Sequence, residues 1–84
     1  MTVREIIKER LHIYFLERLD IEVDMDKEDT PSVEYFDILD LVEVEMDMNK
    51  HFNISMEYEF HNWDAGTIKD IVDTIERHLK EQGL

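Results

Sequence analysis

Apolar residues recur at helical spacing near both ends of the chain. Near the N-terminus they follow one another at three- and four-residue steps, at Val3, Ile7, Leu11 and Tyr14, with Ile6 and Phe15 beside them. Near the C-terminus they form an unbroken stripe of Ile68, Ile71, Val72, Ile75 and Leu79. Positions three and four apart lie on one face of a helix, so the pattern predicts an amphipathic helix at each end.

Polar residues beside these two stripes have the spacing of helix caps. Thr2 and Glu5 fit a capping box, in which each side chain satisfies the other residue's backbone N–H. Asp64 or Thr67 is placed to begin the last helix, and Gly83 is placed to end it.

The middle of the chain fits both a helix and a pair of strands. Helical spacing gives two stripes, namely Leu41, Val44, Met48 and Phe52, and Ile38, Val42 and Met46. Residues 42–48 and 54–60 also alternate as strands do, and Asn49-Lys50-His51 offers a turn between them. The adjacent Leu41 and Val42 break the strand pattern, and the frequent Met, Leu and Glu favour helices. We therefore expect residues 37–51 to be helical, with the hairpin as the alternative and residues 54–60 as the least certain part.

We expect the middle helix to pack against the last one. The expected contacts join Leu39, Val42, Met46 and Phe52 to Ile68, Ile71 and Ile75. Phe60 and Trp63 are expected to fold back onto the same core.

The polar stretch from Asp24 to Ser32 contains the only proline and is predicted to be a loop. Its acidic start resembles a calcium-binding loop, but Asp29 stands where that loop needs Gly and Tyr35 where it needs Glu. The histidines also share no metal-ligand spacing; they are His12, His51, His61 and His78. We therefore expect no metal site.

Composition narrows the class of protein. The chain has 84 residues, which is one small domain and too short for a barrel or a doubly wound sheet. It has no cysteine, no apolar run near the ~20 residues of a membrane span, and an N-terminus unlike a signal peptide. With 22 acidic and 9 basic residues, its net charge is −13. This charge repels nucleic acid and anionic lipid, so basic protein surfaces are the expected partners.

The stretch from Asp37 to Ile54 resembles the second helix of an acyl carrier protein. That family typically has Asp-Ser-Leu, an acidic residue and Val-Glu-Leu, with a Phe before a short loop. Here Asp37, Leu39, Asp40 and Phe52 match at the same separations. The segment that starts at Thr67-Ile68 is similar to the family's last helix, which often starts with Thr-Val.

This resemblance implies a fold and a role. The implied fold is an all-α, four-helix bundle with three long helices and one short one. The implied role is to carry an acyl chain on 4′-phosphopantetheine, and to dock onto Lys and Arg patches of fatty-acid or polyketide enzymes. The docking residues would be Asp37, Asp40, Glu43 and Asp47, which share three- and four-residue steps. The apolar cavity for the chain would be bordered by Leu39, Val42, Met46, Met48, Phe52, Ile68 and Ile71.

The chain departs from the family at the attachment position, where Ile38 replaces the Ser. Attachment needs an oxygen nucleophile, and residues 36–54 contain no Ser, Thr or Tyr. We therefore expect a cytoplasmic, monomeric, non-enzymatic docking domain without a covalent cofactor. One alternative is a carrier that is modified at Ser32 or Ser55. Another is an acidic decoy that binds basic protein surfaces without carrier ancestry.

Overall fold

The regular structure of the chain is helical. The computed structural model describes residues 1–57, 59–60 and 66–83, and its elements are α1 (Val3–Arg18), the 3-10 turn η1 (Ser32–Glu34), α2 (Ile38–Phe52) and α3 (Ile68–Glu81). Within these residues there is no β-strand, and a single isolated bridge joins Pro31 to Thr67. The all-α prediction is confirmed, and the hairpin alternative is wrong because α2 runs through residues 42–48. The fourth, short helix stays a prediction, because the chain between α2 and α3 is described only in part.

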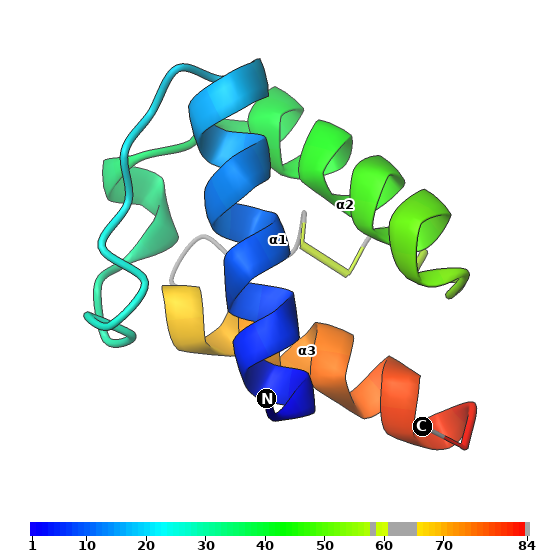
Figure 1. Cartoon of the computed structure of the whole chain (residues 1–84). Helices are drawn as coiled ribbons and strands as arrows, with labels where there is room; N and C mark the ends of the chain where they lie inside the picture. Colours follow the sequence, from blue (N-terminus) through cyan, green and yellow to red (C-terminus); the bar gives the residue numbers. More distant parts are fainter. Residues whose placement is uncertain (58, 61–65, 84) are drawn as a thin grey trace.

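The helix α1 holds the molecule together by packing against both other helices (Figure 1). Its buried residues are Ile7, Leu11, Tyr14 and Phe15, on the stripe that the sequence predicted. The chain then runs along one side of the molecule through η1 to the start of α2 (Figure 1). The described part contains no helix that is both long and apolar enough to cross a membrane.

Fewer apolar residues of α2 face the core than the sequence predicted. Leu41, Val44 and Met48 are inside, whereas Leu39 is 72% exposed and Met46 is 66% exposed. The expected packing of Leu39 and Met46 against α3 is therefore wrong. At about 100° per residue these two side chains lie on the side of the helix opposite the buried stripe. Of the other expected contacts, Phe52 is half-buried against the core, while Ile68, Ile71 and Ile75 are fully inside.

The start of α3 has every early backbone N–H satisfied. Thr67 and Asp70 form a capping box, in which the Thr67 Oγ1 accepts from the Asp70 N–H at 3.3 Å. The two preceding N–H groups donate to carbonyls of the distant loop, Ile68 to Thr30 (3.0 Å) and Lys69 to Glu28 (2.8 Å). Thr67 is thus the cap, while Asp64 lies outside the described residues. Beyond Glu81 the chain turns at Gly83, whose φ of 85° suits glycine.

The alternating segment after α2 forms no strand in its described residues, 54–57 and 59–60, and the last two lie in a turn. Ile54, Met56 and Phe60 are buried, which confirms the expected inward position of Phe60; Trp63 lies outside the described residues. The side-chain amide of Asn49 acts as the neighbouring strand would: its Oδ1 accepts from the Met56 N–H (2.8 Å) and its Nδ2 donates to the Met56 carbonyl (2.9 Å). The alternation of apolar and polar residues in this segment therefore reflects burial of one of its sides. The Asn49 side chain of α2 supplies hydrogen bonds of the kind that a second strand would give.

Candidate partner-docking surface

The first turn of α2 is fixed by two acidic residues of the predicted docking set. Asp37 is the N-cap: its Oδ1 accepts from the Asp40 N–H (2.8 Å), and the Asp40 carboxylate accepts from the Asp37 N–H (3.2 Å). This capping box places negative charge at the positive end of the helix dipole. Ile38 follows as the first residue of the helix and is 57% exposed.

Glu43 and Asp47, the other two residues of the set, have different surroundings. Glu43 is exposed and has no ion pair with any described residue. The Asp47 side chain is mostly buried. It links α2 to α1, because both of its carboxylate oxygens accept hydrogen bonds from the Arg10 guanidinium, at 2.9 and 3.0 Å. Asp47 therefore has its charge largely balanced inside the molecule, and the charge open to a partner is that of Asp37, Asp40 and Glu43.

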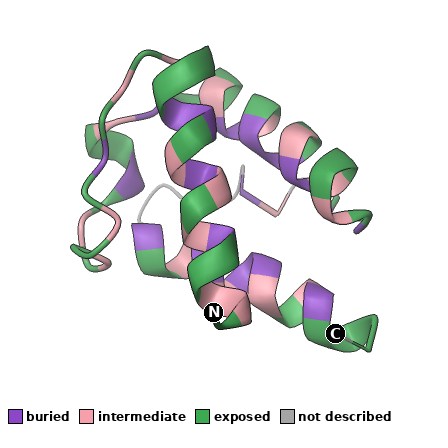
Figure 2. Cartoon of the chain, viewed as in Figure 1, coloured by how far each residue is buried: buried purple, intermediate pink, exposed green. Residues whose placement is uncertain are grey.

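The exposed side of α2 is apolar as well as acidic. Leu39 and Met46 are seven residues apart, so they lie on one side, and Ile38 and half-buried Val42 are next to them. Figure 2 shows the alternation of buried and exposed positions along α2. Large exposed apolar side chains grouped on one helix face are typical of interaction surfaces.

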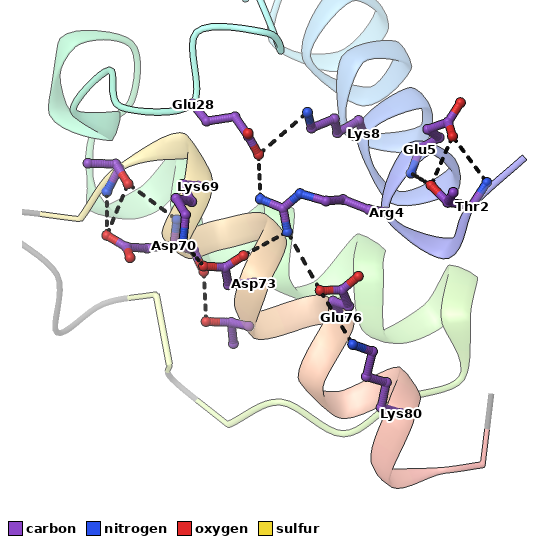
Figure 3. Close-up of polar contacts among 12 residues, drawn as sticks. Thr2, Arg4, Glu5, Lys8, Glu28, Lys69, Asp70, Asp73, Glu76 and Lys80 are labelled. Carbon is purple, nitrogen blue, oxygen red and sulfur yellow. Dashed lines mark hydrogen bonds and ion pairs between the residues drawn. The ribbon is translucent and has the colours of Figure 1, made fainter.

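Charge is distributed unevenly along the chain. Residues 28–49 contain no lysine or arginine, and their acidic residues are Glu28, Asp29, Glu34, Asp37, Asp40, Glu43, Glu45 and Asp47. Four basic residues instead belong to α1 and α3, where they pair with carboxylates: Arg4, Lys8, Lys69 and Lys80 (Figure 3). The exposed side of α2 thus combines apolar side chains with uncompensated negative charge.

The ion pairs between α1 and α3 converge on Arg4 (Figure 3). Its guanidinium donates to Glu28 of the loop and to Asp73 of α3 (2.7 Å), and lies 3.6 Å from Glu76. The hydrogen bond from Arg4 lowers the pKa of Glu28, against the smaller opposing effect of burial. The pKa of Asp73 is lowered first by the hydrogen bond from Lys69, then by that from Arg4. This network is structural: it pins the long loop to the first and last helices.

The two candidate attachment serines have opposite environments. Ser32 is 1% exposed and its hydroxyl donates to the Gly66 carbonyl at 2.9 Å, so it is closed to a modifying enzyme. Ser55 is exposed, but it lies beyond the C-terminal end of α2, away from the acidic first turn. Burial therefore removes Ser32 as an attachment site.

The residues predicted for an acyl cavity do not share one environment. Met48, Ile68 and Ile71 belong to the packed core, Val42 and Phe52 are half-buried, and Leu39 and Met46 are exposed. A surface hollow of about 690 Å³ lies elsewhere, on α1 and the loop after it, and none of the seven lines it. In the described part of the chain, no three His, Cys, Asp or Glu side chains are arranged to hold a metal ion.

Sequence reasoning missed a second polar network, which starts from a buried carboxylate. Glu45 of α2 is 7% exposed, and its Oε2 accepts from the Glu59 N–H (2.9 Å) and the Phe60 N–H (3.4 Å). The Glu59 carboxylate in turn contacts Arg77 and His78 of α3, at 2.5 Å each. The available signal was that Glu45 falls between the buried positions of α2, where an acidic residue needs partners.

Comparisons with known proteins identify no relative: no family model, no curated protein and no solved structure matches this chain.

Proposed function

We propose that this chain is an acyl-carrier-like domain without the modifiable serine, which docks through α2 onto basic surfaces of fatty-acid or polyketide-type enzymes. The observation that carries the proposal is the position of Ile38. Ile38 is the first residue of the second long helix, where a carrier of this family has its serine. Its side chain is 57% exposed to solvent. Asp37, Leu39 and Asp40 surround it as they would surround that serine.

The electrostatic character of α2 supports the same role. The exposed Glu43 and the two capping aspartates leave this helix acidic, without a Lys or Arg before Lys50. Such a surface attracts Lys- and Arg-rich patches and increases the rate of association with them. We place the domain in the cytoplasm as a monomer, with no catalytic step of its own and a four-helix carrier fold.

The test is phosphopantetheine transfer to Ile38→Ser. Wild type and variant are incubated with coenzyme A, Mg²⁺ and a broad-specificity phosphopantetheinyl transferase, and intact masses are measured. In the variant, the new hydroxyl attacks the pyrophosphate of coenzyme A, the phosphopantetheinyl phosphorus–oxygen bond forms, and adenosine bisphosphate leaves. We expect one added group on Ile38→Ser and none on wild type.

Two controls make this result decisive. Ile38→Ala lacks the hydroxyl and is expected to stay unmodified, and a Ser at a helix start is tolerated well enough that Ile38→Ser keeps its helical circular dichroism. A folded Ile38→Ser that gains no mass would contradict carrier ancestry and favour the acidic decoy. A wild type that gains mass, and loses the gain in Ser55→Ala, would instead make it an active carrier with an unusual site.

A further inference from the structure

The most exposed large apolar side chains beyond Met1, among the described residues, gather in one stretch of the chain. They are Leu39 (72%), Met46 (66%), Ile38 (57%) and Val33 (54%). All four fall within residues 28–49, which contain no lysine or arginine. In a small acidic domain with many polar residues, such a concentration of exposed apolar side chains is typical of a surface that binds a partner.

Two side chains of this group, Ile38 and Met46, form a row on α2 with half-buried Val42 between them. Ile38, Val42 and Met46 are successive at four-residue steps, and Leu39 lies beside the row. We call these four residues the apolar ridge. Rows at four-residue spacing are the ridges that fit into the groove between rows of another helix, and this one runs for about 12 Å along α2. Its shape therefore suits a helical occupant with a face two to three turns long.

Charge along the ridge specifies the chemistry of that occupant. The acidic residues lie on one flank and toward the start of the helix, at Asp40 and Glu43, whereas Lys50 lies beyond Met46. Asp47, farther along the same flank, is already paired with Arg10. A partner helix therefore gains most from Lys or Arg along the edge of its apolar face that meets Asp40 and Glu43. A second copy of this chain fits poorly, because it would bring another net charge of −13 to the interface.

We propose that the apolar ridge binds an amphipathic helix of a partner protein that carries Lys or Arg along one edge of an aliphatic face. This inference rests on the proposed docking role of α2 and adds two points to it. The partner is a helix, and Ile38 is itself a binding residue at the position where a carrier would bear its prosthetic group. The isoleucine thus replaces a covalent attachment with an apolar contact.

The experiment is an NMR titration of the full, ¹⁵N-labelled chain with a synthetic peptide of about 14 residues, long enough for three to four helical turns. The peptide has Leu at helical spacing and Lys elsewhere, and a scrambled peptide of the same composition is its control. We expect chemical-shift changes that centre on residues 38–47. The double substitution Ile38→Ser with Met46→Ser is expected to weaken binding about tenfold, because it removes two central apolar contacts.

A matched variant on α1 separates this effect from general attraction. Ile6 and Ile13 are also exposed apolar residues, at 42% and 37%, so Ile6→Ser with Ile13→Ser makes the same chemical change elsewhere. It is expected to change the dissociation constant by less than about twofold, since it lies outside the ridge. Equal weakening by both double variants, equal binding of the scrambled peptide, or no binding at all would overturn the inference.

Failure of this inference is distinguishable from failure of the proposed function. If the transferase modifies Ile38→Ser but the ridge substitutions do not affect peptide binding, the carrier-like proposal stands and the helical partner falls. If the transferase ignores Ile38→Ser while the ridge binds the peptide as expected, the ridge stands as a docking surface without carrier ancestry.

Discussion

At the scale of single residues, Arg4 links three parts of the fold. It joins Glu28 of the loop to Asp73 and Glu76 of α3, and it does so from the first turns of α1. Burial alone would lower the pKa of Arg4, but the hydrogen bonds to Asp73 and Glu28 together raise it. The positive charge is therefore held by both partners, and its removal leaves each of these three carboxylates with a single lysine as its ion-pair partner.

We predict that Arg4→Met lowers the free energy of unfolding by about 1–2 kcal/mol at pH 7, as expected for a partly covered ion-pair network. The pKa values of Glu28 and Asp73 are lowered in the folded state, so their stabilisation is complete above the ordinary carboxyl pKa. It is lost as the pH falls through the lowered values. The difference between wild type and variant should therefore shrink below about pH 4.5. Urea unfolding at a series of pH values measures this.

Arg18→Met is the matched control for this prediction. Arg18 is exposed at the end of α1 and has no ion pair with a described residue. It should change the unfolding free energy by no more than about 0.5 kcal/mol. If both arginine variants lost the same stability, or if the Arg4 effect persisted unchanged at pH 3, the network would not act as described.

At the scale of elements, α2 positions both the apolar ridge and the chain that follows the helix. Glu45 and Asn49 lie beside the ridge, seven residues after Ile38 and Val42, and their side chains bond to the backbone of the segment after the helix. Asn53, with a φ of 55°, ends α2 in the left-handed conformation and sends the chain back along it. The segment's path therefore depends on side chains of the helix it leaves.

We predict that Glu45→Ala destabilises the protein by about 1–3 kcal/mol, because it leaves the N–H groups of Glu59 and Phe60 without their carboxylate acceptor. The measurement is thermal or urea unfolding followed by circular dichroism. The control is Glu43→Ala, two residues earlier on the same helix and exposed, which should cost less than about 0.5 kcal/mol. Similar losses in the two variants would count against a structural role of the buried carboxylate.

The helices were predictable from sequence, because their signals are local. The apolar stripes of α1 and α3 repeat at helical spacing, and the structure buries them. Thr2 and Thr67 cap these two helices, as their capping-box spacing indicates. The contacts of Leu39 and Met46 were not predictable in the same way. A helix with apolar residues on more than one side has no unique inward face, and tertiary packing chose the stripe of Leu41, Val44 and Met48.

The candidate site was predictable only in its composition. The sequence identifies Asp37, Asp40, Glu43 and Asp47 as one acidic set, but it does not reveal that Arg10 of α1 neutralises Asp47. It also gives no sign that Ser32 is buried against Gly66, since both facts depend on residues more than thirty positions away. Pairings of this kind are set by tertiary structure.

At the scale of the whole molecule, the dominant quantity is the net charge of −13 on a body with extents of 33 × 26 × 23 Å. Several acidic residues are paired in the Arg4 and Arg10 contacts, but 22 acidic residues exceed 9 basic ones, so repulsion outweighs attraction overall. Repulsion of this kind destabilises a compact state and keeps copies apart.

We predict that added salt stabilises the protein at neutral pH. At 0.1 M salt, charges separated by more than about 10 Å are largely screened, which relieves repulsion across the molecule more than it weakens close ion pairs. If screening recovers about 1 kcal/mol, the melting temperature should rise by about 4–8 °C for a domain of this size. Calorimetry in sodium chloride, and in Mg²⁺ at equal ionic strength, measures it. A melting temperature that falls or stays constant with salt would show that the ion pairs dominate.

The hydrogen bonds at the start of α3 constrain the order in which the protein folds. The first two N–H groups of this helix donate to Thr30 and Glu28, close to forty residues earlier in the chain. No local turn can provide those acceptors, so the beginning of α3 is complete only after a long loop has closed, at an entropic cost that grows with its length. Loop and helix start must therefore form in one cooperative step. In the intact protein, the Ile68 and Lys69 amides should exchange their hydrogens only when that long loop opens.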